Sequence, residues 1–232
     1  MDYSKIITNP EDIRQKHLLK RKWSEHDFFN HFINLVKDES NPIFLEKKGD
    51  INNKNFVDEI IELDPDLIVL YGCSLIKDPL INAFENRVLN VHLGLSPYYR
   101  GSGTNFWPLV NKEPEYVGAT FMYADAGVDT GKIIHQIRAE VKENDTPHTI
   151  GNRLIASIPD VYRKIIVNYD NLEKIKQLDN PEDGRLYRKK DFSKESVVKL
   201  YKNFKEDMCE EYLRTYDKRI KNVPIIKNPV VE

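Results

Sequence analysis

Residues 67–93, LIVLYGCSLIKDPLINAFENRVLNVHL, decide the fold of this chain. The stretch opens with an apolar run over residues 67–71, which is short, partly β-branched and stopped by Gly72, as expected of a parallel strand covered on both faces. Residues 78–84 have helical spacing, and residues 88–93 have the pattern of a second strand. Strand, helix and strand in such a short stretch form a crossover unit, which predicts an α/β fold.

Patterns on both sides extend this unit into a sheet flanked by helices. Strands are predicted over residues 43–45, 117–123 and 133–141. Helices are predicted over residues 24–36 with a Ser-x-x-Asp cap, 56–61, 146–166 and onward from Ser193. Pro159 is expected to kink or interrupt the third of these helices. We therefore expect a Rossmann-like, mostly parallel sheet in a domain of residues 1–175, followed by a small helical appendage over residues 176–232.

Composition limits the possible partners. The 232 residues include 35 basic and 37 acidic side chains, so no overall field attracts nucleic acid. Cys73 and Cys209 lack metal-ligand spacing and are expected to be buried thiols in a reducing compartment. Residues 1–11 contain no apolar run of signal-peptide length, and no run approaches the roughly 18 apolar residues of a membrane span. The expectation is a cytoplasmic protein with no membrane partner.

Three polar side chains are candidates for a catalytic site. Asn90 and His92 alternate with apolar residues, so they share one face at the end of a predicted strand. In α/β sheets ligands bind beyond the carboxyl ends of strands. Asp129 lies in a loop rich in Gly and Asp between the next two strands and could reach the same crevice. Structural interpretations remain open: Asn90 could cap a turn, His92 could be a half-buried histidine with satisfied hydrogen bonds, and Asp129 could form a turn.

A family resemblance joins these fragments. Its blocks are Asn90-Val91-His92, Leu95-Ser96-Pro97, Arg100-Gly101, Gly118-Ala119-Thr120 and Asp129-Thr130-Gly131. In order and spacing they resemble the folate-dependent formyltransferases, which include glycinamide ribonucleotide, methionyl-tRNA and sugar-nucleotide formyltransferases. The resemblance covers about residues 64–155. Residues 92–107, 131–136 and 148–154 look most like the branch that formylates amino sugars, among them sugars of O-antigen biosynthesis.

The resemblance implies a reaction and roles for the three residues. A neutral amine would attack the formyl carbon of 10-formyltetrahydrofolate, the co-substrate, giving a tetrahedral oxyanion that collapses as the folate nitrogen leaves. A proton would also have to leave the amine. Histidine is the only one of the three residue types whose ordinary pKa lies near neutrality, so His92 would accept the proton or donate to the oxyanion. Asn90 would donate to the oxyanion, and Asp129 would hold the imidazole ring.

The resemblance also implies binding residues. The pterin would lie between two loops, which contribute Ser74, Leu75, Ile76, Ala124 and Asp125, although Leu75 and Ile76 could equally be core residues. The candidates for binding the acceptor are Tyr98, Arg100, Asn105 and Trp107, although the arginine could instead fix its own loop. The basic cluster of residues 185 and 188–190 is interpreted as a solvated face. No metal site is predicted, because the histidines share no ligand spacing.

Departures from the family leave rival functions open. The family begins with an apolar strand and a turn rich in Gly or Ser, whereas residues 1–22 contain only Ile6-Ile7 and a charged, helix-like stretch. The chain is thus a shortened form, or its substrate edge is built differently. The C-terminal part is too short and not basic enough for the domain that tRNA formyltransferases add, so tRNA ranks last as an acceptor. The rivals are hydrolysis of the same folate and a domain that only binds a folate or nucleotide sugar. An exposed apolar helix in the tail would be compatible with a homodimer.

Overall fold

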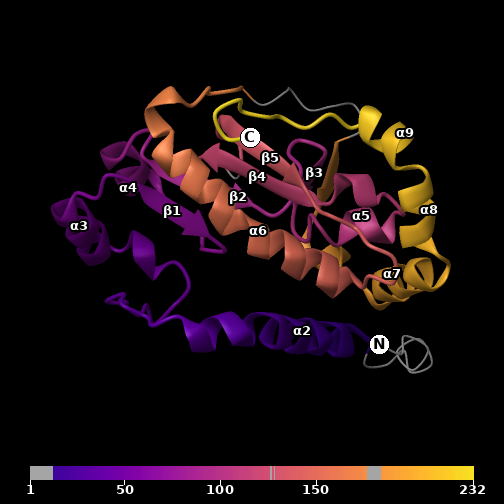
Figure 1. Ribbon diagram of the computed structural model, residues 1–232. Coiled ribbons are helices and arrows are strands. Elements are labelled where there is room, and N and C mark those ends of the chain that lie inside the picture. The colour runs from indigo at the N-terminus through magenta and orange to yellow at the C-terminus, as the bar shows by residue number, and fades with distance from the viewer. Residues whose placement is uncertain (1–12, 126, 128, 177–183) are drawn as a thin grey trace.

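A mixed four-stranded sheet forms the centre of the molecule (Figure 1). The computed structural model describes residues 13–125, 127, 129–176 and 184–232, so the predictions for residues 1–11 lie outside the described residues. The sheet has the order β1-β2-β4-β5, with β1 (Ile68–Tyr71), β2 (Val88–His92), β4 (Gly118–Tyr123) and β5 (Ile133–Arg138). Because β4 is antiparallel to β2 and to β5, three of these four strands run in one direction. The predicted α/β class is confirmed.

Helix α6 (Pro147–Val167) covers one face of the sheet. Thr146 caps it by accepting a hydrogen bond from the Thr149 amide, and Pro147 occupies the first turn, where its missing N–H costs nothing. The apolar side of α6 packs against alternate residues of the strands, and the buried set includes Leu89, Val91, Phe121, Ile150, Leu154 and Ile158. The helix continues through Pro159, so the alternative of an interruption there is wrong.

The opposite face of the sheet is covered near β1 by two shorter helices, α3 (Lys54–Leu63) and α4 (Asp78–Ala83). Ile76, Leu80, Phe84 and Val88 form a second buried cluster on this side. Strand β1 itself is only half covered, since Val69 is 44% and Tyr71 50% exposed. The prediction that both faces of this strand are covered is therefore wrong. In the described residues β1 is an edge strand with β2 as its only sheet neighbour.

The N-terminal helix departs furthest from the prediction. Helix α2 (Ile13–Leu35) begins 11 residues before the predicted start at Ser24, because good helix formers fill its first half. Only Ile13 and His17 are buried, where this half packs against α6 and α7. The aromatic and aliphatic side chains of its second half are exposed, among them Phe32 at 56% and Ile33 at 68%. Residues 43–45 form no strand, and Phe44 there is 85% exposed.

The C-terminal residues join the main core. Strand β6 (Arg185–Tyr187) pairs in parallel with β3 (Tyr99–Gly101), and neither strand was predicted. Three helices follow: α7 (Lys194–Lys205), α8 (Met208–Arg214) and α9 (Tyr216–Lys221). The remaining short elements are α5 (Trp107–Val110), η2 (Asp50–Asn52), η3 (Pro114–Tyr116), η4 (Tyr169–Asn171) and η5 (Lys189–Asp191). The division at residue 175 stays a prediction, although Leu200, Met208 and Tyr212 share the core of the sheet.

Two surface properties follow from this packing. The apolar side of α7 is buried, with Val197, Leu200 and Tyr201 fully covered, so the predicted exposed apolar helix in the tail is wrong. The exposed apolar residues of the long helices gather on α2 instead, and the predicted homodimer loses the observation on which it rested. Among the described residues, every helix is too short or too polar to cross a membrane.

Candidate active site

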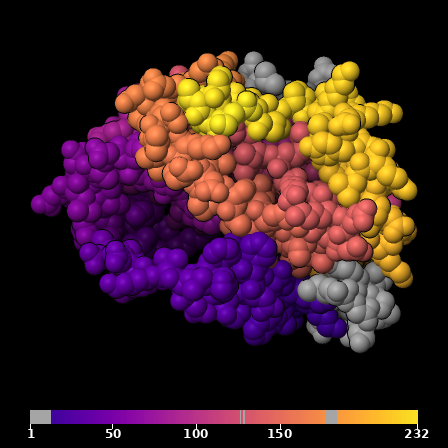
Figure 2. All heavy atoms as spheres, in the orientation of Figure 1, coloured from indigo at the N-terminus to yellow at the C-terminus, as the bar shows by residue number. Residues whose placement is uncertain are grey.

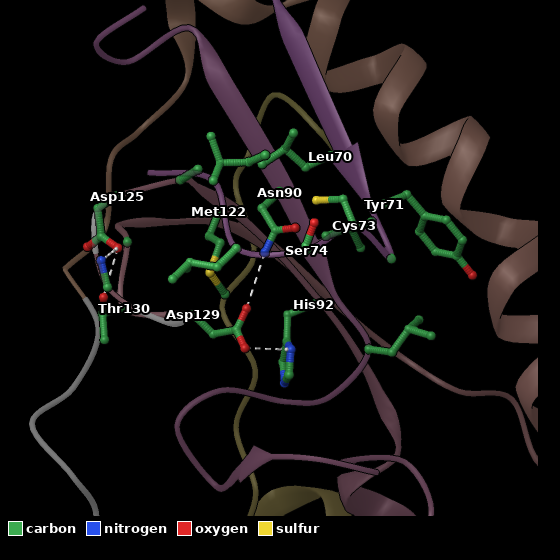
Figure 3. Close-up of a pocket in the computed structure, with 18 of the residues that line it drawn as sticks. Leu70, Tyr71, Cys73, Ser74, Asn90, His92, Met122, Asp125, Asp129 and Thr130 are labelled. Carbon is green, nitrogen blue, oxygen red and sulfur yellow. Dashed lines mark hydrogen bonds and ion pairs between the residues drawn. The ribbon is translucent and has the colours of Figure 1, made fainter. Parts of the chain in front are cut away.

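Asn90, His92 and Asp129 lie in contact at the end of β2 (Figure 3). Their positions follow from the alternation of β2, whose Leu89 and Val91 are buried on the α6 face while Asn90 and His92 are partly exposed on the other. The His92 Nδ1 atom is 3.1 Å from Asp129 Oδ2, and Asn90 Nδ2 donates to Asp129 Oδ1 at 3.2 Å. One carboxylate thus holds both the imidazole and the amide. Their catalytic roles stay a prediction.

The backbone around Asp129 is held closely to the sheet. Asp129 has φ 54°, a left-handed conformation that aspartate tolerates better than most residues. A Cβ atom on Gly131 would lie 1.7 Å from the Tyr123 carbonyl oxygen, so only glycine allows this approach to β4. The Asp125 carboxylate accepts a hydrogen bond from Thr130 Oγ1 at 2.8 Å. These contacts fix the direction in which the Asp129 side chain points.

The electrostatics of the three side chains favour a charged carboxylate. Burial acts to raise the pKa of Asp129, but the hydrogen bond and charge of His92 and the hydrogen bond from Asn90 outweigh it, so that pKa is lowered. The His92 side chain is 11% exposed, and its Nε2 atom has no hydrogen-bond partner among the residues that the structure describes. This nitrogen faces Gly94, where an added Cβ would lie 2.9 Å from it. It is a buried ring nitrogen whose hydrogen-bonding capacity is unused within the described residues.

The three residues line a cavity of about 450 Å³. All five residues predicted to contact the pterin line it as well, namely Ser74, Leu75, Ile76, Ala124 and Asp125. Ile76 lines the cavity and also belongs to the second core cluster, Leu75 is half exposed, and pterin binding by these residues stays a prediction. Cys73 also lines the cavity and is exposed, so its predicted burial is wrong, whereas Cys209 is buried. The pKa of the Cys73 thiol is raised. Its partial burial is the main cause, and the charge of the nearby Asp129 adds to it.

The formyl transferase family profile matches residues 5–166. The chain belongs to this family. A methionyl-tRNA formyltransferase of Caldanaerobacter subterraneus is 34% identical over 112 residues, which are 47% of this chain and 36% of that relative. Another, from Alkaliphilus oremlandii, is 34% identical over 125 residues, which are 53% of this chain and 40% of that relative. The matched segments therefore span two fifths or less of these curated relatives.

Solved structures show the same fold at lower identity. A 4-N formyltransferase from Francisella tularensis superposes with a TM-score of 0.54 at 23% identity, covering 76% of this chain and 72% of that one. A sugar N-formyltransferase from a Shewanella species gives a TM-score of 0.52 at 22% identity, covering 65% of this chain and 64% of that one. These likenesses support the formyl transferase fold. In this chain the cavity lies at the carboxyl end of β2.

The four predicted acceptor residues of this family member make mainly internal contacts. Tyr98 donates its hydroxyl hydrogen to the Pro224 carbonyl at 3.0 Å, and Trp107 Nε1 donates to the Ser102 carbonyl at 2.9 Å. Asn105 bonds the backbone of Gly118 with both ends of its amide. The Arg100 Nε atom is buried without a partner among the described residues. Of the four, Asn105 alone lines a described cavity, and their binding role stays a prediction.

That cavity, of about 270 Å³, is a feature of the chain that the sequence did not reveal. It lies between α2, α6 and the loop before α5, and its walls include His17, Arg21, Asn105, His148 and Asn152. Two histidines of this wall are linked by the Tyr201 hydroxyl, which lies 3.0 Å from His17 Nδ1 and 3.4 Å from His148 Nε2. The only sequence signal was the spacing of His17, Arg21 and Glu25 along one side of a helix.

Burial keeps both histidines neutral at physiological pH. It lowers the pKa of His17 to about 4, with a smaller contribution from Arg21. It lowers the pKa of His148 to about 3, helped by His17, Arg21 and Lys20.

The basic cluster of residues 185 and 188–190 differs in part from the predicted solvated face. The Arg185 guanidinium donates a hydrogen bond to Glu113 Oε1 at 2.8 Å. No group of three or more potential metal-binding side chains occurs in the described ranges.

Proposed function

We propose that the chain transfers a formyl group from 10-formyltetrahydrofolate to the amine of a small acceptor, a nucleotide-linked amino sugar. The proposal rests on the surroundings of the two ring nitrogens of His92. Its Nδ1 atom is held by the Asp129 carboxylate, its Nε2 atom is buried without a partner in the described residues, and its side chain lines the cavity. An imidazole held in this way is suited to accept a proton from an attacking amine.

The larger cavity supports a folate as the donor. Its apolar wall includes Leu70, Leu75, Ile81 and Met122, which can cover a flat ring system. Ser74 and Asp125 lie on the polar part of the wall, and backbone groups of the same two loops can bind the hydrogen-bonding edge of a pterin. A volume of about 450 Å³ lies within the usual range for small-molecule sites. The residues present thus fit the donor that the family resemblance implies.

The side chains have separate tasks in this proposal. 10-Formyltetrahydrofolate supplies the formyl group. Asn90 can donate a second N–H of its amide to the formyl oxygen as negative charge develops there, while its first N–H remains on Asp129. His92 accepts the amine proton at Nε2, and Asp129, ionised at neutral pH, stabilises the resulting imidazolium. Gly94 leaves room for the imidazole ring, because a Cβ there would lie 2.9 Å from His92 Nε2.

Asp129→Asn tests these roles. An asparagine amide can donate to His92 Nδ1, which would leave Nε2 protonated and unable to act as a base. We expect turnover to fall by about 10² to 10⁴-fold while 5-formyltetrahydrofolate still binds, measured by tetrahydrofolate absorbance and by ligand titration. The matched control is Asp66→Asn, an exposed aspartate outside the cavity, which should keep wild-type turnover. Near-normal turnover of Asp129→Asn would remove this residue from the mechanism.

The acceptor is tested in the same assay. Tetrahydrofolate release that requires a nucleotide-linked amino sugar supports transfer, release in its absence supports hydrolysis, and folate binding without release supports a binding domain. Methionyl-tRNA is the comparison acceptor, because the curated relatives at 34% identity act on it by name. Preference for methionyl-tRNA over the amino-sugar nucleotide would contradict the acceptor class proposed here.

A further inference from the structure

The two cavities share part of their walls at a junction next to His92. Arg21, Leu93 and Thr104 line both the cavity of about 450 Å³ and the cavity of about 270 Å³. His92 Nε2 is buried beside this shared wall, since a Cβ built on Gly94 would lie 2.9 Å from that nitrogen and 2.7 Å from Thr104 Cβ. A ligand in the smaller cavity would therefore approach His92 from the side of Thr104 and not from the space between the two folate loops.

The protein supplies positive charge on the α2 side of this junction. Residues 13–22 of α2 contain five basic side chains and no acidic one. His17 and His148 are neutral at physiological pH, with pKa values of about 4 and about 3, so the charge at the junction comes from the arginine and lysine side chains of α2. Among these basic residues, Arg21 alone lines either cavity, and it lines both.

Arg21 is held in a position to bind an anion. Its Nε atom donates to Glu25 Oε1 at 2.6 Å, one helical turn further on. Its terminal Nη1 and Nη2 groups make no hydrogen bond or ion pair with any residue in the described part of the chain, and the side chain is 57% exposed. A guanidinium fixed at Nε presents its two terminal groups as a fork, which matches two oxygens of a phosphate. Figure 2 shows a hollow between α2 and the body of the molecule.

We propose that Arg21 binds a phosphate or diphosphate of the acceptor at the junction of the two cavities. This inference rests on the proposed function, and it makes Arg21 a specificity-determining residue for a phosphorylated small amine. The acceptor then spans the smaller cavity: its anionic group lies on Arg21, and its amine-bearing part lies at His92 Nε2.

The binding experiment uses the full chain, with uridine diphosphate and inorganic pyrophosphate as anionic probes and 5-formyltetrahydrofolate as the donor probe, each by titration calorimetry. We expect Arg21→Gln to weaken uridine diphosphate and pyrophosphate by about tenfold to a hundredfold. Arg21→Lys, which keeps the charge, should recover part of this loss. The control is Lys22→Gln, an exposed neighbour on the same helix that lines neither cavity and should bind all three probes as the wild type does.

The outcomes separate this inference from the proposed function. Equal loss of the two phosphate probes in Arg21→Gln and Lys22→Gln would mean only diffuse attraction to α2, and no loss in Arg21→Gln would remove Arg21 from binding; both overturn the inference. Loss confined to 5-formyltetrahydrofolate would also overturn it, because Arg21 would then bind a carboxylate of the donor. If the wild type binds 5-formyltetrahydrofolate but neither phosphate probe, the inference fails while the proposed function stands. If 5-formyltetrahydrofolate does not bind the wild type, the proposed function fails, and this inference fails with it.

Discussion

Acid should destabilise this protein through the two buried histidines beneath α2. His17 is 6% and His148 5% exposed, their ring centroids are 4.9 Å apart, and the Tyr201 hydroxyl lies between them. Protonation of either ring would place a cation in this buried site, beside the existing charges of Arg21 and Lys20. The unfolded chain carries no such penalty, so acid shifts the equilibrium toward unfolding.

The size of the effect follows from the pKa of His17, which is about 4 in the folded protein against an ordinary value of 6.5. Because the folded pKa is lowered, the full stability is present above pH 6.5 and is lost progressively as the pH falls toward 4. At pH 5 the loss is about 2 kcal/mol for this group, from roughly 1.4 kcal/mol for each of 1.5 pH units. This loss is a large fraction of the stability of an ordinary domain.

Urea unfolding at pH 7 and pH 5, followed by circular dichroism, measures this loss. His17→Gln cannot take up the proton, so it should lose about 2 kcal/mol less than the wild type between the two pH values. His26→Gln, at an exposed histidine of the same helix, should lose as much as the wild type. If His17→Gln and the wild type lose the same stability, the histidine is not a buried neutral group and the reasoning is wrong.

Two further substitutions test the packing around the site. Gly94→Ala would bring a methyl group to 2.9 Å from His92 Nε2 and 2.7 Å from Thr104 Cβ, so we expect turnover to fall by up to about 10²-fold with folate binding retained; unchanged turnover would contradict this geometry. Asp145→Asn removes the charge of a carboxylate that is 5% exposed and accepts two hydrogen bonds from Arg153, so urea unfolding should show a loss of about 2–4 kcal/mol; a loss below about 0.5 kcal/mol would contradict its role.

The elements that the sequence predicts well are those with a strong local period. The crossover unit of β1, α4 and β2 was predicted within one or two residues, because apolar spacing and Gly72 mark each boundary locally. Whether a neighbouring strand covers β1 could not be predicted in the same way. The apolar run of β1 looks the same whether or not a neighbouring strand covers it, and the structure leaves Val69 and Tyr71 about half exposed.

Features that depend on distant pairing were missed. Strands β3 and β6 have three residues each, too few to show a period, and they pair residues 86 positions apart at Tyr99 and Arg185. The positive charge of Arg185 suggested a solvated face, but Glu113 offered no local sign that it would pair with this side chain. Such contacts are determined by tertiary packing, to which the local sequence pattern is blind.

In the candidate site, too, the residues related by a local pattern were predicted from it, and those brought together by tertiary packing were not. Strand alternation alone predicted that Asn90 and His92 share a face, whereas Asp129 is 39 residues from Asn90, and its loop position allowed contact that only the family resemblance made specific. The smaller cavity was not predicted from the sequence. It requires α2, the start of α6 and the loop before α5 to converge, and no local pattern relates His17 to His148.

The position of Arg21 depends on how α2 is attached. Only Ile13 and His17 of this helix are buried, and His17 lies one turn before Arg21 on the same side. The hydrogen bonds of Asn152 Nδ2 to Ser24, at 3.0 Å, hold the helix one turn beyond it. The guanidinium therefore lies between two points of attachment, and the second of these is on α6, the helix that covers the catalytic sheet. A charge held in this way keeps a fixed distance from His92 as long as α2 stays packed. The contact among His17, Tyr201 and His148, through which acid should weaken the fold, is also the contact that keeps the proposed phosphate-binding residue in place.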